Sequence, residues 1–405
     1  MHTWVRRCAA LLAAAAMLFI IGWGYLYCRL PDTFLVPQGQ TLTLAQMPWL
    51  TPKQKNGAAP AGAVPAGGSY NITLSLFGKL PVKTVRAVVV DRRAVTVCGT
   101  PFGIKMFSEG AIVVGFTDIQ QPGGNANPAK EAGLRMGDRI LSIDETDTHS
   151  NEDVAQAIQQ AKDRPVTVHY IRGEQSMTTQ LQAVQDQESG TWRAGMWVRD
   201  SSAGIGTLTF IDHQTGIYAG LGHSISDVDT GESIALRTGE IGPVTITGYE
   251  SGAVGAPGQL KGRFTSDISI GDIILNGTSG VYGKIRIVGD GQDMPVAQAQ
   301  EIKEGPAQIL TTISGTTPQW YDVEIERLSL TEEDPNRNML LRVTDPALLH
   351  TTGGIVQGMS GSPVVQNGHL VGAVTHVLVN DPTRGFGIFA ENMLETADAA
   401  VKKSE

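Results

Sequence analysis

The segment that most constrains this chain is an uncharged run near its N-terminus, CAALLAAAAMLFIIGWGYLY, which extends from Cys8 to Tyr27. About 20 apolar residues are the length that a helix needs to cross the hydrocarbon core of a bilayer. Arg6 and Arg7 precede the run, and positive charges favour the cytoplasmic side of a membrane. We therefore predict a cytoplasmic N-terminus and transmembrane anchor in residues 1–29, with the rest of the chain exported.

A cleaved signal peptide is the alternative interpretation of the same run, because Gly22 and Gly24 offer the small residues of a cleavage site. The length of the run favours an anchor. So do Trp23, Tyr25 and Tyr27 near its end, since aromatic residues gather at membrane interfaces. Both interpretations place the bulk of the chain outside the cytoplasm.

Composition narrows the classes of protein that remain. A chain of 405 residues exceeds one ordinary hydrophobic core, and 48 glycines indicate many tight turns, so we expect two main domains and a mainly β fold. The net charge of -9 includes no basic block, which argues against nucleic acid as a partner. The three cysteines form no disulfide framework, and no histidine is followed by glutamate, so H-E-x-x-H is excluded and we expect neither a metal nor a cofactor.

The region after the anchor divides in two by composition. Residues 30–69 are predicted to be an exported segment that ends in the low-complexity stretch TPKQKNGAAPAGAVPAGGS (51–69), which is typical of a flexible linker. Residues 70–97 change to alternating apolar and polar positions in NITLSLFG and VRAVVVD, which predicts half-buried strands. We expect a β-rich segment there.

The stretch NPAKEAGLRMGDRILSID (127–144) predicts a short helix at 129–132, a glycine cap and a strand at 139–143. A second helix is expected at 151–161 and another strand at 166–171. This order, with the pattern A-G-L-x-x-G-D-x-I-L-x-I, resembles a PDZ domain over residues 98–185. A domain that only spaces the following region from the membrane is the alternative.

The PDZ resemblance implies binding of a peptide as an added strand beside the second helix. Phe102, Gly103 and Ile104 match the loop whose backbone N–H groups bind the peptide carboxylate, and Ala155 would contribute side-chain selection. This loop has one glycine, in contrast to the usual G-L-G-F order, so an internal segment could be bound in place of a free C-terminus.

The strongest local motif is Gly358-Met359-Ser360-Gly361-Ser362-Pro363. Its form, G-x-S-G-[GS]-P, is used by chymotrypsin-like proteases at their nucleophile. A tight glycine turn lets the backbone N–H groups of Gly358 and Ser360 point at one oxyanion while the Ser360 hydroxyl faces the substrate. Ser362 stands one residue too far along for this geometry. A plain Gly/Ser turn is the alternative, which the following strand pair around Asn367-Gly368 makes weaker.

His223, in Gly222-His223-Ser224-Ile225, is the candidate general base. A lone histidine is more often structural, but its position before Ser360 matches the chain order of chymotrypsin-like enzymes. Sequence spacing does not select the acid. The carboxylates between the histidine and the serine include Asp227, Asp229, Asp267, Asp272, Asp322 and Asp345.

Three blocks resemble the stage IV sporulation protein B peptidase family: LFGKLPVKTV, GHSISDVDTG, and the C-terminal stretch from VTDPALLHTTGG through GMSGSP to FAENML. In that family an anchor, a PDZ domain and a protease domain occur in this order. The resemblance implies a chymotrypsin-like double β-barrel at residues 188–400. It also implies Ser360 as nucleophile, His223 as base and Asp345 as acid.

The same resemblance implies a role. Family members are signalling serine endopeptidases of endospore-forming bacteria and act in the space between mother-cell and forespore membranes. They cleave themselves near the N-terminus, which releases them, and they cut the regulatory subunit of an intramembrane protease so that a late mother-cell sigma factor is activated. The expected partners are thus that protein substrate, the chain's own N-terminal region and the membrane. Two other functions remain open, a PDZ adaptor with an inactive protease-like domain and a general envelope quality-control protease.

Overall fold

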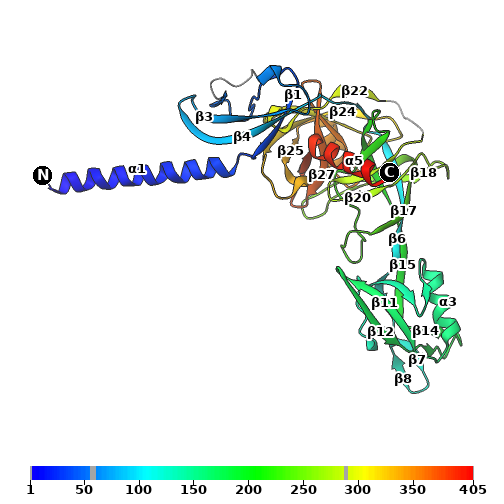
Figure 1. Cartoon of the computed structure of the whole chain (residues 1–405). Helices are drawn as coiled ribbons and strands as arrows, with labels where there is room; N and C mark the ends of the chain where they lie inside the picture. The colour runs from blue at the N-terminus through cyan, green and yellow to red at the C-terminus, as the bar shows by residue number, and fades with distance from the viewer. Residues whose placement is uncertain (1, 55–60, 287–290, 405) are drawn as a thin grey trace.

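The computed structural model describes residues 2–54, 61–286 and 291–404. Helix α1 (His2–Cys28) leaves the rest of the molecule as a lone rod (Figure 1). Residues Arg7–Cys28 of this helix have a mean hydropathy of 2.0 and none of this stretch is buried against other parts of the chain. The helix is therefore long and apolar enough for a single-pass membrane anchor.

The chain after α1 forms a small β module, not a linker followed by strands. Its sheet has the order β1-β4-β3-β2, with strands β1 (Thr33–Pro37), β2 (Leu50–Gln54), β3 (Ser69–Leu76) and β4 (Leu80–Val90). Apolar residues from both sides of the predicted boundary at residue 69, among them Phe34, Leu50 and Leu74, share one buried core. The linker prediction for 51–69 is thus wrong at residues 51–54, which belong to a strand, and residues 55–60 lie outside the described residues.

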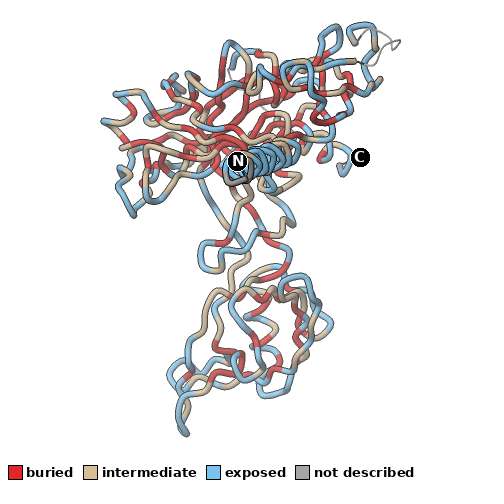
Figure 2. The backbone as a smooth tube through the Cα atoms, turned by 90° about the vertical axis from the view of Figure 1, so that its left-hand side faces the viewer, coloured by how far each residue is buried: buried red, intermediate tan, exposed pale blue. Residues whose placement is uncertain are grey.

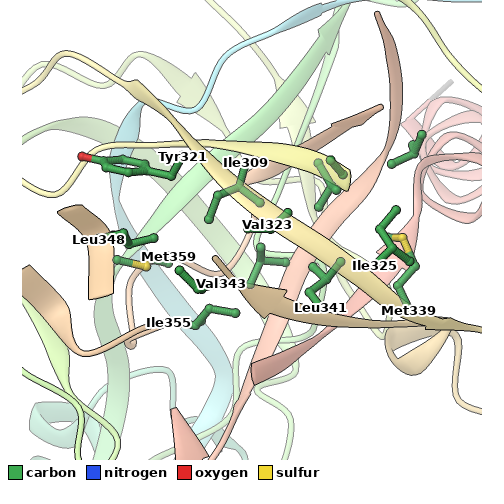
Figure 3. Close-up of a cluster of buried hydrophobic side chains, with 14 of the residues drawn as sticks. Ile309, Tyr321, Val323, Ile325, Met339, Leu341, Val343, Leu348, Ile355 and Met359 are labelled. Carbon is green, nitrogen blue, oxygen red and sulfur yellow. The ribbon is translucent and has the colours of Figure 1, made fainter. Parts of the chain in front are cut away.

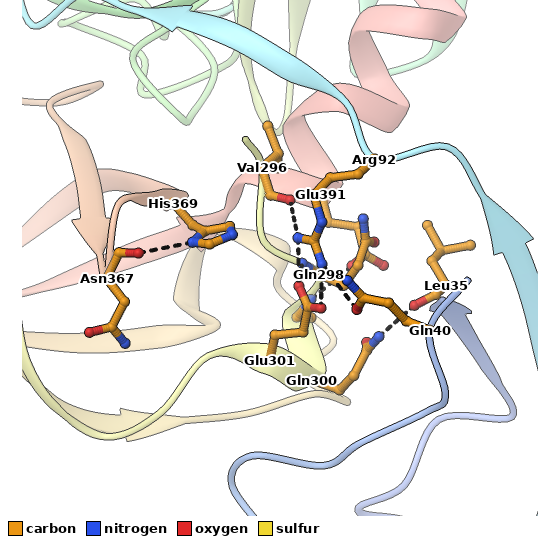
Figure 4. Close-up of polar contacts among 11 residues, drawn as sticks. Leu35, Gln40, Arg92, Val296, Gln298, Gln300, Glu301, Asn367, His369 and Glu391 are labelled. Atoms are coloured by element: carbon orange, nitrogen blue, oxygen red, sulfur yellow. Dashed lines mark hydrogen bonds and ion pairs between the residues drawn. The ribbon is translucent and has the colours of Figure 1, made fainter. Parts of the chain in front are cut away.

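Polar contacts hold this module against the protease region (Figure 4). The guanidinium of Arg92, just after β4, donates to both carboxylate oxygens of Glu301, at 2.6 and 2.9 Å. Gln300 donates its side-chain N–H to the carbonyl of Leu35 in β1, and the backbone N–H of Ala45 donates to the carbonyl of Gln300. The N-terminal module is therefore bound to the protease domain by its own strands.

The PDZ region forms a separate lobe that has its own buried interior, and a narrow neck joins it to the rest of the molecule (Figure 2). Its elements are β7 (Ile119–Gln121), β8 (Gly124–Ala126), α2 (Pro128–Glu131), β9 (Arg139–Ile143), β10 (Thr146–Asp147), α3 (Asn151–Ala161), β11 (Val166–Arg172), β12 (Gln175–Leu181), β13 (Val184–Gln185) and β14 (Trp192–Arg193). Helix α3 begins where the sequence predicts, with Ser150 and Asp153 in a capping box, and α2 begins one residue earlier than predicted, at the residue after its cap Asn127.

Two long strands make the neck. Strand β6 (Pro101–Phe116) pairs with β15 (Met196–Asp212) from Pro101 opposite Thr207 to Phe116 opposite Met196. Strand β6 runs from the protease region into the PDZ lobe, and β15 runs back from the PDZ lobe into the protease region. The PDZ core begins at Ala111, whereas the earlier half of β6 belongs to the protease region.

The protease region combines an open sheet with a closed barrel. The open sheet contains the protease halves of β6 and β15 with β5 (Ala94–Val97), β16 (Ile217–Gly220), β17 (Leu236–Glu250), β18 (Gln259–Phe264), β19 (Gly271–Asp272), β20 (Leu275–Gly277), β21 (Gly280–Lys284) and β22 (Gln292–Pro295). The barrel has the order β23-β24-β25-β28-β27-β26, formed by β23 (Gly305–Thr311), β24 (Gln319–Leu328), β25 (Met339–Val343), β26 (Pro363–Gln366), β27 (His369–Leu378) and β28 (Asp381–Phe389). The mainly β fold with a PDZ domain and a β-barrel protease domain is confirmed.

The N-terminal module also contains the short helix η1 (Ala61–Ala63). In the protease region the helices are η2 (Ala299–Glu301), η3 (Pro335–Arg337), α4 (Pro346–Thr352) and the longer α5 (Ala390–Ser404). The barrel is filled by branched and sulfur-containing side chains, including Ile309, Val323, Leu341 and Met359 (Figure 3). Because Met359 is fully buried in this core, the residues on either side of it are fixed at the barrel surface.

Candidate active site

Ser360 lies in a glycine turn that follows α4 and leads into β26. Gly358 and Gly361 on either side adopt φ values of +97° and +93°, which favour glycine. A Cβ on Gly361 would meet the carbonyl oxygen of Thr207 at 2.0 Å and the backbone nitrogen of Leu221 at 2.4 Å. The motif thus has glycine here because β15 and the end of the Leu221 turn approach the backbone directly.

Hydrogen bonds fix this turn. The backbone N–H of Gly361 donates to the carbonyl of Val374 at 2.8 Å, and the N–H of Thr207 donates to the carbonyl of Ser360 at 2.9 Å. The hydroxyl of Thr207 also donates to the carbonyl of Gly358 at 2.9 Å. Over the residues that the structure describes, the N–H groups of Gly358 and Ser360 have no internal acceptor. Two free donors in one rigid turn are what binding of an oxyanion requires.

Ser362 has a different role from Ser360. Its side chain is fully buried and its hydroxyl contacts the hydroxyl of Thr311 at 2.8 Å and the carbonyl of Met359 at 2.6 Å. The structure therefore makes Ser362 part of the turn's internal bonding and keeps it away from any substrate.

His223 lies on the turn that follows β16, where Leu221 and Gly222 both have positive φ values. Its Nδ1 atom is 2.8 Å from the carbonyl oxygen of Ser224. A carbonyl only accepts, so Nδ1 carries the proton and a neutral ring has its lone pair on Nε2. Burial lowers the pKa of His223 below the ordinary histidine value, which keeps the ring neutral and basic at pH 7.

Ser360 and His223 face one hollow of about 540 Å³ between the open sheet and the barrel. The hydroxyl of Ser360 donates to the carbonyl of Thr375 on β27 at 2.7 Å. In this conformation the Ser360 hydroxyl bonds to a backbone carbonyl of the barrel and not to the imidazole.

His376 on β27 belongs to a stretch, Thr375-His376-Val377, that the sequence predicts at the edge of the specificity pocket, and it was not predicted to be catalytic. Its ring lies 4.5 Å from the ring of His223, centroid to centroid, and it lines the same hollow. Desolvation, with smaller contributions from His223 and Arg337, lowers the pKa of His376 to about 4. The sequence signal for it is a histidine in the strand that follows the serine motif across the Asn367-Gly368 turn.

In the structure Asp345 bonds to the start of its own helix and His223 bonds to a backbone carbonyl, so the assignment of Asp345 as the catalytic acid stays a prediction. Asp345 is the N-cap of α4, and one of its oxygens accepts from the backbone N–H groups of Ala347 and Leu348 at 2.9 and 3.0 Å. The other accepts from the N–H of Asp322 at 3.4 Å. The physical reason is the sequence Asp-Pro at a helix start, where the carboxylate satisfies free backbone donors.

Four of the other candidate acids bond to groups other than His223. Asp227 and Asp229 pair with Arg199, Asp272 pairs with Arg286, and Asp322 accepts from Gln308. The Nδ1 atom of His223 is therefore oriented by a backbone carbonyl, not by a carboxylate.

The PDZ lobe carries a second hollow, of about 500 Å³, between α3 and the start of β15. Ala155 is exposed on α3 and lines this hollow together with Trp197 and Val198. The prediction for Ala155 thus fits a peptide groove bordered by a strand and a helix.

The carboxylate-binding loop was predicted at the wrong place. Phe102 and Ile104 are buried in the core of the open sheet, where the Phe102 ring meets that of Tyr218 edge to face. A Cβ on Gly103 would meet the ring of Phe264 at 2.2 Å. These residues are strand β6 of the protease region, and their glycine serves close packing, so they do not contact a PDZ ligand.

A serine on a barrel turn, a neutral histidine in the same hollow and two free N–H donors are the arrangement of a serine peptidase, here with a PDZ domain before it. Comparison with known families agrees. The model of the SpoIVB peptidase S55 family matches residues 190–394, and a PDZ domain model matches residues 125–172. The chain belongs to the SpoIVB peptidase S55 family.

Single proteins are more distantly similar. The putative zinc metalloprotease CPE1693 of Clostridium perfringens is 29% identical over 160 residues, which are 37% of this chain, and this chain spans 45% of that protein's length. Among the described residues of this chain, no group of three or more His, Cys, Asp or Glu side chains could hold a metal ion.

The solved structures that resemble this chain also have low sequence identity to it. The PDZ domain of an SdrC-like protein from Listeria monocytogenes is 21% identical, covers 22% of this chain and 87% of its own, and has a TM-score of 0.19. The HtrA-type protease AlgW with a decapeptide is 13% identical, covers 50% and 55%, and has a TM-score of 0.30. The inactive form of the Rv3671c protease is 14% identical, covers 49% and 83%, and has a TM-score of 0.29.

Proposed function

We propose that this protein is a membrane-anchored serine endopeptidase that cleaves itself and then a regulatory membrane protein during endospore formation. The observation that carries the proposal is that Ser360 and His223, which are 137 positions apart in the sequence, line one hollow within the region that matches the peptidase family. The cut regulator would be the subunit that holds an intramembrane protease inactive. Its loss would activate a late mother-cell sigma factor.

In the proposed reaction Nε2 of His223 takes the proton of the Ser360 hydroxyl as Oγ forms a bond to the substrate's carbonyl carbon. The resulting oxyanion accepts from the N–H groups of Gly358 and Ser360, and each donor lowers the barrier by about 3 kcal/mol. His223 then protonates the leaving amine. Water attacks the acyl-enzyme through the same histidine, which restores Ser360.

In this proposal the two arginines before the run stay cytoplasmic, and the site lies outside the cytoplasm in the space between mother-cell and forespore membranes. Self-cleavage would then release the enzyme from its membrane. The N-terminal module restricts where a releasing cut can fall, because β1 pairs with β4 over five residue pairs and β2 pairs with β3. A cut within 61–68 leaves both strands in place, whereas a cut between Cys28 and Thr33 frees the protease.

The test is incubation of the full chain in detergent micelles beside a Ser360→Ala variant, with gel analysis and N-terminal sequencing of any product. We expect self-cleavage in the wild type and none in Ser360→Ala. Ser362→Ala is the matched control, which should still cleave although it loses the bond to Thr311. Equal loss of cleavage in both variants, with folding intact, would refute Ser360 as nucleophile.

The two cut positions are separable by membrane fractionation. A product that begins after residue 60 but stays with the membrane until denaturant is added would indicate a cut within 61–68, which leaves the protease bound to the anchor through β1 and β2. A soluble product that begins between residues 29 and 33 would support release. An inactive adaptor predicts no product at all.

A further inference from the structure

The segment that carries His223 is held from a distance by a residue of the strand that borders the PDZ groove. Strand β15 contributes Trp197 and Val198 to the groove, and Arg199 follows them directly. The pairing of β15 with β6 shifts register at Trp197/Val198 and again at Arg199/Ser201. Bulges of this kind redirect side chains, and they recur beside active sites.

Arg199 reaches the turn that follows the catalytic histidine. Its guanidinium is 3.0 Å from the carboxylate of Asp227 and 2.7 Å from that of Asp229. The Asp227 side chain is 1% exposed, and it accepts from the backbone N–H groups of Asp229 and Thr230 at 3.1 and 3.0 Å. A buried carboxylate that organises its own turn depends on its cation, because loss of the partner leaves an uncompensated charge.

The near end of the same segment is fixed by Asn276 of β20. Its side-chain oxygen accepts from the N–H of Ile225 at 2.8 Å, and its amide donates to the carbonyls of Ile225 and Ile234 at 2.9 and 3.0 Å. Ile225 is two residues after His223, whose own ring bonds to the carbonyl of Ser224. The segment 224–235 is therefore closed at its base by Asn276 and held at its tip by Arg199.

We infer that Arg199 is a positioning residue for His223, through which the strand beside the PDZ groove sets the geometry of the catalytic base. This rests on the proposed serine peptidase activity. A peptide that adds to β15 at Trp197 and Val198 contacts the residues next to Arg199, so occupancy of the groove and order of the histidine segment are linked through one ion pair. The PDZ lobe also approaches the segment directly, since a Cβ on Gly137 would lie 3.3 Å from the Glu232 carboxylate.

The first test measures the rate at which a fluorophosphonate probe labels Ser360 in the full chain in micelles, so that no protein substrate is needed. Arg199→Gln should label about tenfold more slowly than wild type, since loss of positioning of a catalytic group has effects of this order or larger. Arg199→Lys should recover part of the rate. Arg164→Gln removes a PDZ ion pair of the same length, 2.7 Å to Asp144, and should label like wild type.

The pH profile separates positioning from general loss of stability. A loosened segment admits water to His223, so the acid limb of labelling should move to higher pH in Arg199→Gln. The ionisable ring that faces His223 is His376, which in turn is influenced by Arg337 and Asp334, and none of these three is changed. Hydrogen exchange of amides 224–235 should also be faster in Arg199→Gln.

The last arm tests the link to the groove. Ala155→Trp fills the groove from α3, and its effect on labelling should differ by at least about threefold between the wild-type and Arg199→Gln backgrounds. Additive effects, or an unchanged rate and pH profile in folded Arg199→Gln, would overturn the inference. Absence of labelling in both wild type and Ser360→Ala would refute the proposed function and this inference with it. Labelling of wild type at a rate that Arg199→Gln does not change would refute this inference alone.

Discussion

The two halves of the candidate active site are held in different ways. The serine turn is part of the barrel, with Met359 in the core and backbone bonds from Gly361 and Ser360 to neighbouring strands. The histidine turn is a surface segment whose order depends on the side chains of Asn276 and Arg199. The serine turn is thus formed by the fold itself, whereas the histidine is placed by contacts that other parts of the molecule can change.

The largest effect that follows from this comparison is expected at Gly361. An alanine there would clash with Thr207 and Leu221 and would have to keep a φ of +93°, so Gly361→Ala should lower the free energy of unfolding by about 3 kcal/mol or more. Gly231→Ala, on the histidine segment, has a φ of +72° but open space around its Cβ, so its cost should be about 1 kcal/mol. Chemical denaturation of both variants measures the difference, and equal costs would contradict a rigid serine turn.

A smaller effect is expected at Asp345. As an N-cap, Asp345→Ala should lower the free energy of unfolding by about 1 kcal/mol, whereas Asp345→Asn keeps an acceptor for the N–H groups of Ala347 and Leu348 and should be close to wild type. Activity of Asp345→Asn should remain high in folded protein.

An acid that orients the histidine behaves differently, because its replacement by asparagine lowers kcat by about 10⁴-fold. Parallel measurement of labelling rate and stability for Asp345→Asn and Asp345→Ala therefore distinguishes a cap from a triad member. A large loss of activity in stable Asp345→Asn would support the triad assignment.

The parts of this site that the sequence predicts correctly are those with local backbone chemistry. The glycines around Ser360 indicate the turn, and in the PDZ lobe the residues near Ser150 indicate a helix start, because each signal lies within a few residues of its effect. The same local logic applies at Asp345, where the sequence Asp-Pro marks a helix cap at the residue that the family resemblance interprets as an acid.

The errors elsewhere have a non-local cause. Nothing near Phe102 reveals that β6 continues through two lobes, because its partners in β15 and β17 lie about 100 or more positions away. The strand β1 is short, and its partner β4 follows a low-complexity stretch, so composition hides the pairing of Thr33 with Arg86. The side chains of Asn276 and Arg199 carry no motif, so only the folded chain identifies them as supports of the histidine segment.

The smallest expected effect is a shift in the pH dependence of labelling, and it distinguishes the two histidines. Burial lowers the pKa of His223, and the neutral ring is the base, so activity should be complete at pH 7 and fall only as pH drops through a value below the ordinary 6.5 or so. His376, with a pKa of about 4, is neutral across the same range and lacks the bond to the Ser224 carbonyl. His376→Gln should therefore keep an acid limb, whereas His223→Gln should lose labelling at every pH. If His376→Gln abolished the acid limb of labelling while His223→Gln kept it, the base would be His376 on the barrel strand β27. The nucleophile and the base would then both be held by the rigid barrel.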